Sequence, residues 1–214
     1  MLAQTNYSVL FEPEISLGYD VTSRYSHSFG IENRNLVFND SDLKFEIKHI
    51  ELAHTSTYAL NSLQNIGLGI QFRFKENFDT IKENEFRLLQ EYKWKNSGEY
   101  LDIAQRIRTE QRFYTSITTF RTRYELGLSF PLQRIKPHTH KTNISQTYIK
   151  TEMESLLEVA KTQKPKYEQR FSALFGCLLH VKTGFEIGFQ YRLADYTQNI
   201  EHELFIVTGI DIHL

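Results

Sequence analysis

The feature that most constrains this chain is a long alternation of polar and apolar residues, which is sharpest at residues 103–113. Arg106, Arg108, Glu110 and Arg112 are separated there by residues that are apolar or neutral. Because successive side chains of a β-strand point to opposite faces, this segment predicts a strand with one charged face and one apolar or neutral face. A membrane β-barrel has this pattern, with lipid outside the wall and a polar lumen inside it.

The same alternation recurs along the chain and predicts eleven strands. The strands cover approximately residues 6–21, 23–38, 43–52, 66–74, 85–94, 103–113, 120–130, 148–160, 168–179, 185–193 and 204–214. The parity slips between Ile47 and Ile50, which predicts a β-bulge. Since single-chain bacterial barrels have even numbers of strands, we expect about twelve strands, or ten. A further strand is expected near residues 33–38 or 55–65. Segment 148–160 also fits a helix, because Glu and Leu are good helix formers, but its apolar residues keep one parity.

The length of these strands favours a transmembrane barrel over a soluble sheet. Strands of roughly 11–16 residues, tilted by about 45°, cross the hydrocarbon layer of a bilayer, whereas strands of soluble proteins usually span about 5–6 residues. The chain has no apolar run long enough for a transmembrane helix. We expect one all-β domain over residues 4–214, an antiparallel up-and-down transmembrane β-barrel. Residues 1–3 are interpreted as the remnant of a signal-peptide end or as an initiator Met.

The alternative fold is a soluble β-sandwich or a lipocalin-like cup. A lipocalin places apolar residues inside its barrel, so this chain would have to bury a large number of charges there. Aromatic residues near the predicted strand ends favour the membrane barrel, because its two interfaces carry aromatic girdles. These residues are Trp94, Tyr100, Phe113, Tyr114, Phe130, Tyr191 and Tyr196. Gln90, Gln105 and Gln111 fall on apolar faces and fit lipid less well.

Charged residues of the interior parity form the candidate functional site. Arginines and glutamates on neighbouring strands are expected to pair, because opposite charges across strands stabilise a sheet. One interpretation is a packed salt-bridge network that fills and stiffens the barrel. Another is a charged constriction that selects small ions or solutes. The predicted lumen charge network consists of Glu85, Arg87, Glu91, Arg106, Arg108, Glu110, Arg112, Arg121, Arg123, Glu125, Glu152, Glu154, Arg170, Glu186 and Arg192.

No residue pattern indicates a metal or a cofactor. Cys177 is the single cysteine, so neither a disulfide framework nor a cysteine metal cluster is expected. His138 and His140 lie beside Pro137 and are interpreted as a solvent-facing pair in a loop. The histidines without a predicted partner at the spacing of metal ligands are His49, His54, His180, His202 and His213.

Catalysis is not expected. Arginine is a poor acid–base group at neutral pH. Hydrolases built on barrels need a nucleophile and a base on adjacent strands, and no histidine is predicted at a height that matches Ser116 or Ser172. Gly67 and Gly69 lack the third glycine and the helix of a phosphate loop, so we expect them to make room for large lumen side chains.

Several short motifs occur in an order that resembles the family catalogued as domain of unknown function 2490. Residues 106–113 (RIRTEQRF) resemble its R-x-R-x-E-Q-R-[FI] strand, and residues 121–124 (RTRY), which lead to a proline turn at 130–132 (FPL), resemble the strand after it. Residues 167–171 (YEQRF) and 82–87 (KENEFR) resemble a later strand and the start of the fifth. The likeness covers nearly the whole chain. The segment around residues 137–143 departs from the short turn common in that family.

The resemblance implies an outer-membrane barrel of Gram-negative bacteria, typical of the Bacteroidota, with no established biochemical activity. Together with the residue pattern, it predicts a monomeric outer-membrane protein with a structural or narrow, porin-like pore role. The alternatives are a non-conducting barrel subunit of a larger envelope assembly and an outer-membrane hydrolase. Membrane lipid is the expected partner, and the net charge of −1 gives no indication of nucleic-acid binding.

Overall fold

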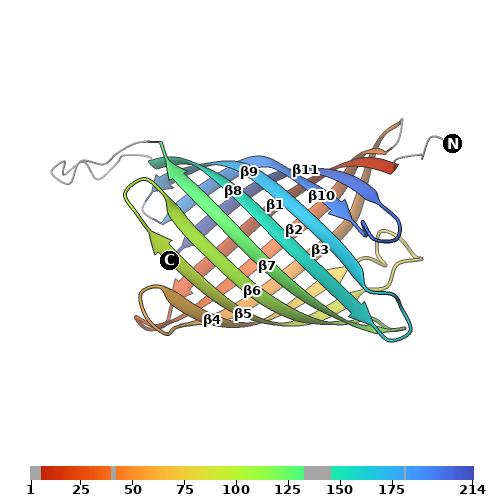
Figure 1. Cartoon of the computed structure of the whole chain (residues 1–214), viewed down its shortest axis with the longest axis horizontal. Coiled ribbons are helices and arrows are strands. Elements are labelled where there is room, and N and C mark those ends of the chain that lie inside the picture. The colour runs from red at the N-terminus through yellow and green to blue at the C-terminus, as the bar shows by residue number, and fades with distance from the viewer. Residues whose placement is uncertain (1–5, 40–41, 133–145, 181) are drawn as a thin grey trace.

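The computed structural model describes residues 6–39, 42–132, 146–180 and 182–214, and these form one closed β-barrel (Figure 1). The prediction of a single all-β barrel is confirmed. The strands are β1 (Asn6–Asp20), β2 (Tyr25–Asn39), β3 (Asp42–Ala59), β4 (Gln64–Phe74), β5 (Glu85–Ser97), β6 (Asp102–Phe113), β7 (Thr118–Pro131), β8 (Gln146–Ala160), β9 (Lys166–His180), β10 (Thr183–Ala194) and β11 (Glu201–His213).

The barrel closes through a parallel pair of strands. Each strand pairs antiparallel with the next along the chain, but β1 and β11 run parallel, from Asn6↔Glu201 to Gly18↔His213. The strand count, eleven within the described residues, lies between the ten and twelve expected. An odd number of strands in an up-and-down meander leaves the first and last strands pointing the same way, so closure has to be parallel. The start of β1 and the end of β11 therefore lie at opposite ends of the barrel (Figure 1).

The strands have the predicted facing. Large apolar side chains of one parity are exposed on the outer wall, among them Ile31 at 56% and Leu68 at 65% relative exposure. The charged residues of the other parity line an internal cavity. Two of the glutamines on the outer face have partners: Thr109 donates a hydrogen bond to Gln90 (2.8 Å), and the Tyr124 hydroxyl donates one to Gln105 (3.1 Å).

The interruption of the alternation in β3 corresponds to a shift in the strand register. The β2–β3 register shifts between Arg34, which pairs with His49, and Asn35, which pairs with Ile47. One residue of β3 is therefore left without a partner on β2, which confirms the predicted bulge. Residues 33–38 belong to β2, and residues 55–65 belong to β3, a turn and the start of β4, so neither segment adds a strand. Segment 148–160 lies in β8, as its parity predicts, and is not helical.

The interior contains few apolar side chains. Leu10, Leu36 and Phe205 form a small buried cluster, with Val207 packed against it. A Cβ added at Gly67 would lie 2.7 Å from the Glu91 side chain, and one at Gly69 would lie 2.8 Å from Leu89. These two glycines therefore make room for lumen side chains, as predicted.

Within the part of the chain that the structure describes, no helix is long and apolar enough to span a membrane. The interpretations of residues 1–3, of His138 and His140, and of the connection around residues 137–143 fall outside the described residues.

Candidate functional site

The structure places every residue of the predicted lumen charge network on the inner wall of the barrel. Most of them line one central cavity of about 520 Å³ or are buried directly behind it. Glu125, Glu152 and Glu186 line the hollow that continues from it along β7, β8 and β10. The alternation in the sequence was sufficient to assign these side chains to the interior.

The arginines of β6 and β7 are each held by carboxylates. Arg108 contacts Glu91 at 2.7 Å on β5. Arg123 contacts Glu110 at 3.0 Å on β6. Arg106 pairs with Glu125 on β7 and lies 3.4 Å from Glu154 on β8. Bonds to an ionised partner are stronger than neutral hydrogen bonds, so this set stiffens the wall.

Two carboxylates are fully buried among the guanidinium groups. The side chains of Glu85 and Glu110 are 0% exposed. Glu85 accepts from Lys75 (2.8 Å) and Arg87 (2.5 Å) and also pairs with Arg112. A carboxylate without water requires such partners, because an isolated buried charge is strongly unfavourable.

Several pairs span strands that are not neighbours. Arg112 on β6 reaches Glu158 on β8 at 2.5 Å, and Arg87 on β5 reaches Glu51 on β3 at 3.4 Å. Arg192 on β10 crosses β11 to reach Glu12 on β1 at 2.9 Å. The network therefore ties the closing strands of the barrel to the rest of the wall.

Sequence reasoning missed the part of the network that lies on β1 to β4. Arg73 contacts Glu51 at 2.5 Å, and Arg34 pairs with Glu12. The parity signal was present, since Glu12 alternates with outward-facing apolar residues. However, the charges are sparser there, and small polar residues and the β2–β3 bulge interrupt the pattern. The missed lumen residues of these four strands are Glu12, Glu14, Glu32, Arg34, Glu51 and Arg73. Glu158 on β8, Glu168 on β9 and Glu203 on β11 also lie outside the predicted network.

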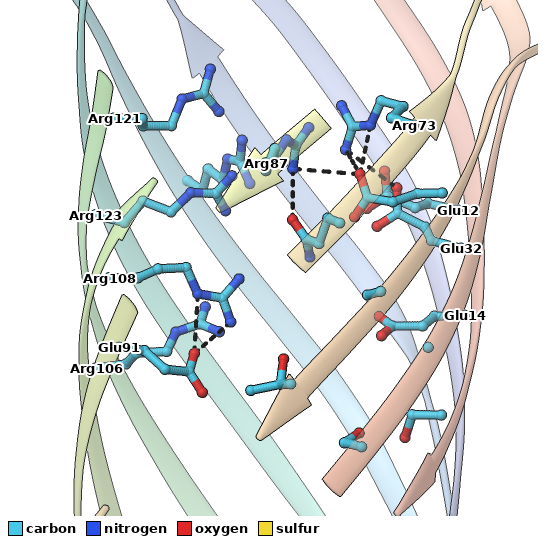
Figure 2. A pocket seen from close by; sticks show the side chains of 18 of the residues that line it. Glu12, Glu14, Glu32, Arg73, Arg87, Glu91, Arg106, Arg108, Arg121 and Arg123 are labelled. Atoms are coloured by element: carbon cyan, nitrogen blue, oxygen red, sulfur yellow. Dashed lines mark hydrogen bonds and ion pairs between the residues drawn. The ribbon is translucent and has the colours of Figure 1, made fainter. Parts of the chain in front are cut away.

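The arginines of β6 and β7 and the glutamates of β1 and β2 lie on opposite sides of the cavity, with Glu91 among the arginines and Arg73 beside the glutamates (Figure 2). Arg106, Arg108, Arg121 and Arg123 project from β6 and β7 on one side. Glu12, Glu14 and Glu32 project from β1 and β2 on the other side. We call these the arginine wall and the glutamate wall. Each side also carries charges of the other sign, since Arg108 pairs with Glu91 and Glu12 pairs with Arg34.

Glu14 is distinctive within the glutamate wall. It lies directly opposite Glu32 in the β1–β2 register, and its side chain is exposed to the cavity. Among the described residues it has no hydrogen bond and no ion pair. A cation that enters the lumen would find its carboxylate available.

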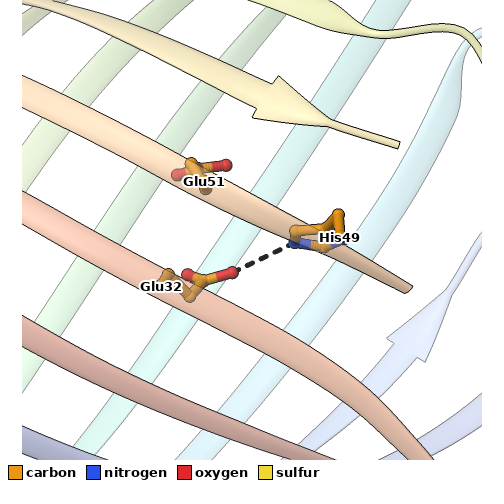
Figure 3. A group of neighbouring side chains, drawn as sticks. All are labelled: Glu32, His49 and Glu51. Atoms are coloured by element: carbon orange, nitrogen blue, oxygen red, sulfur yellow. Dashed lines mark hydrogen bonds and ion pairs between the residues drawn. The ribbon is translucent and has the colours of Figure 1, made fainter. Parts of the chain in front are cut away.

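Glu32, His49 and Glu51 lie close enough together to be considered as a metal site (Figure 3). His49 contacts Glu32 at 3.3 Å. Both carboxylates already have guanidinium neighbours, since Arg73 lies 2.5 Å from Glu51 and 3.9 Å from Glu32. A divalent ion would have to displace Arg73. The residues therefore fit the salt-bridge network better than a metal site.

The prediction that no histidine has a partner at the spacing of metal ligands is wrong for His49 and His54, and His202 and His213 also have polar neighbours. His49 has the two carboxylates described above, and His54 lies 3.1 Å from His27. His202 contacts the Tyr191 hydroxyl at 2.6 Å, and His213 contacts Asp20 at 3.1 Å. Parity and register bring these residues together, whereas sequence spacing does not indicate the contacts.

The two serines considered as nucleophiles have other partners. Ser172 in the lumen accepts a hydrogen bond from Gln190 at 3.0 Å. Ser116 lies in the turn after β6, where its backbone and its hydroxyl donate to Glu83 at 3.0 and 3.1 Å. Neither serine contacts a histidine within the described residues.

Comparison with known proteins identifies a matching family. The model of a family described as protein of unknown function (DUF2490) matches residues 13–203. No curated protein and no solved structure matches the chain.

Proposed function

Because the chain belongs to the DUF2490 family of proteins of unknown function, we propose its role from its structure: an integral β-barrel of a bacterial outer membrane. The barrel has a charged lumen and acts as a structural protein or as a narrow pore. It works as a monomer surrounded by lipid, and its lumen performs no catalysis.

The observation that carries this proposal is the apolar outer wall. Exposed Ile, Leu, Phe and Tyr side chains occur on the outward parity of all the described strands, and Phe189 and Phe120 are more than half exposed. Soluble monomers rarely expose apolar patches larger than a few hundred Å². Lipid would cover this wall, and the closed ladder leaves no strand edge to be satisfied in the hydrocarbon layer.

The arginine wall and the glutamate wall favour a narrow pore as the more specific role. A cavity of about 520 Å³ has the volume of a site for a small molecule. Opposite charges on its two sides would orient a dipolar or zwitterionic solute as it passes. Rings of charged side chains also select ions in known pores.

The alternative is a barrel that does not conduct and serves as a subunit of an envelope assembly. The many salt bridges along the inner wall support it, since their side chains occupy part of the interior. A hydrolase is the weaker alternative, because Ser116 and Ser172 have non-histidine partners and arginine is a poor acid–base group.

Single-channel recording in planar bilayers tests the pore role. We expect small steps whose ion selectivity moves toward cations in Arg108→Gln and toward anions in Glu14→Gln. Lys82→Gln, in the exposed β4–β5 loop, serves as the control and should leave selectivity unchanged. Absence of steps in correctly inserted protein would reject the pore and leave the subunit role.

A further inference from the structure

Two histidines lie side by side on the outer wall, at the end of the barrel that carries the C-terminus. His27 is near the start of β2, and His54 is near the end of β3. The β2–β3 register pairs His27 with Ser56 and Phe29 with His54. The four residues share the outward parity, because Ser28 and Thr55 between them line the cavity.

The polar atoms of this group converge. His27 Nδ1 lies 3.1 Å from His54 Nε2, and Ser56 Oγ lies 3.1 Å from the same His27 nitrogen. The two imidazole rings stack, with centroids 5.2 Å apart and planes inclined at 24°. Two facing imidazole nitrogens repel through their lone pairs unless a proton or a cation lies between them.

From this geometry we propose that His27 and His54, assisted by Ser56, bind a divalent transition-metal ion on the outer surface of the barrel. Zinc binds imidazole nitrogen at about 2.0–2.1 Å in tetrahedral sites, which places two such nitrogens about 3.3 Å apart. The observed separation of 3.1 Å differs from this by a few tenths of an ångström. Binding therefore requires little change in the distance between the two nitrogens.

The ligand set determines the class of metal. Two imidazoles and a hydroxyl favour Zn²⁺, Ni²⁺ or Cu²⁺, whereas Ca²⁺ and Mg²⁺ prefer several carboxylate oxygens. Among the described residues no carboxylate contacts either ring, so oxygen-preferring cations gain little here. Water completes the coordination shell.

Neighbouring aromatic rings hold the imidazoles in place. Tyr25 packs edge-on against His27 with centroids 4.8 Å apart, and Phe29 stacks on His54 at 4.6 Å. Tyr19 also lies against His27, at 5.4 Å. Restriction of the rings before binding lowers the entropy that the metal site has to overcome.

The experiment uses the full chain in detergent micelles, without a histidine tag. Zinc chloride is titrated by calorimetry, and Cu²⁺ is followed by electron paramagnetic resonance, which detects coordinated nitrogen. We expect one ion per chain and nitrogen splitting from two imidazoles. His27→Gln and His54→Gln should each weaken binding by about tenfold or more, since even outer-shell partners of metal ligands contribute this much. Ser56→Ala should weaken it less.

Matched controls separate this site from the other histidines. His202→Gln alters an outward histidine that contacts Tyr191 rather than a second imidazole, and it should bind as the unaltered chain does. His138→Gln/His140→Gln should also bind normally. The proposal is overturned if no ion binds, if the His27 and His54 variants retain full affinity, or if binding is lost with either control. Unchanged heat-modifiable migration in gels verifies that each variant is folded.

Discussion

Arg108 on β6 and Arg123 on β7 lie directly opposite each other in the sheet register, and each is held by a different carboxylate, Glu91 or Glu110. Arg87 and Arg112 are directly opposite in the same way. Like charges at such positions destabilise a sheet. The buried glutamates between them therefore determine whether the barrel wall is stable.

Glu85→Gln tests this dependence on buried carboxylates. The substitution removes the charge that Arg87, Arg112 and Lys75 share, and leaves the two arginines facing each other. Breaking a buried ion pair costs about 3 kcal/mol, so we expect a loss of that order in the free energy of unfolding, measured by urea titration in lipid vesicles.

Glu99→Gln is the matched control, because the side chain lies exposed in the β5–β6 turn. It should change stability by no more than about 0.5 kcal/mol. Equal stability of the two variants would mean that water in an open lumen replaces the lost carboxylate.

Because β9 and β10 pack closely at Gly188, a methyl group added there should lower the stability of the barrel strongly. A Cβ at Gly188 would lie 2.1 Å from the backbone oxygen of Ala173, whereas the nearest atom to a Cβ at Gly209 is 4.0 Å away. Overpacking costs about 1–3 kcal/mol. Gly188→Ala should therefore unfold at clearly lower urea concentration, and Gly209→Ala should not. If the two variants unfolded at the same urea concentration, β9 and β10 would not be packed as closely as the structure shows.

A charge on the outer wall tests the contact with lipid. Leu68 lies in the middle of β4 and is 65% exposed. An arginine at the bilayer midplane costs about 2–4 kcal/mol, so Leu68→Arg should destabilise the barrel by this amount in vesicles. Ile81→Arg, in the β4–β5 loop, should have little effect, since Ile81 is 90% exposed outside the strands. If Leu68→Arg left the stability of the barrel unchanged, this wall would face water and not lipid.

Lys75 predicts a dependence of stability on pH. It follows the last residue of β4, outside the strands, and burial lowers the pKa of its ammonium group to about 8, although Glu85 opposes the shift. Between about pH 8 and pH 10.5 the unfolded chain binds more protons at this group, so stability should rise with pH across that range.

Lys75→Met should flatten this rise, and Lys82→Met, at an exposed lysine of the same loop, should preserve it. Urea midpoints at several pH values give both slopes. Equal slopes in the two variants would assign the dependence to another group.

The alternation of residues was sufficient to predict the strands, their facing and most of the charged interior. Residues 103–113 illustrate why, because lipid-compatible and ionic side chains alternate along this segment. Only one orientation of the strand places the first set toward lipid and the second set toward the lumen. Parity also located the bulge near His49, because a single inserted residue reverses the facing of everything after it.

The sequence did not reveal the contacts that depend on strand register or on closure of the barrel. The rule of even strand number assumes an antiparallel closing pair, and β1 and β11 pair in parallel instead. Contacts such as Arg192–Glu12 form only once the barrel has closed. The His27–His54 contact likewise depends on which residues of β2 and β3 face each other, and sequence spacing does not determine this.

Trp94 offers the most direct test of the outer wall, because it is the only tryptophan of the chain. It lies near the end of β5 and lines a recess with Tyr92 and Tyr124 on the outward parity. The measurement is quenching of its fluorescence in vesicles whose lipid acyl chains carry bromine at defined depths. We expect strong quenching by bromine near the headgroups, weaker quenching by bromine near the midplane and little by iodide in the buffer. Full quenching by iodide with none by brominated lipid would contradict a barrel embedded in a membrane.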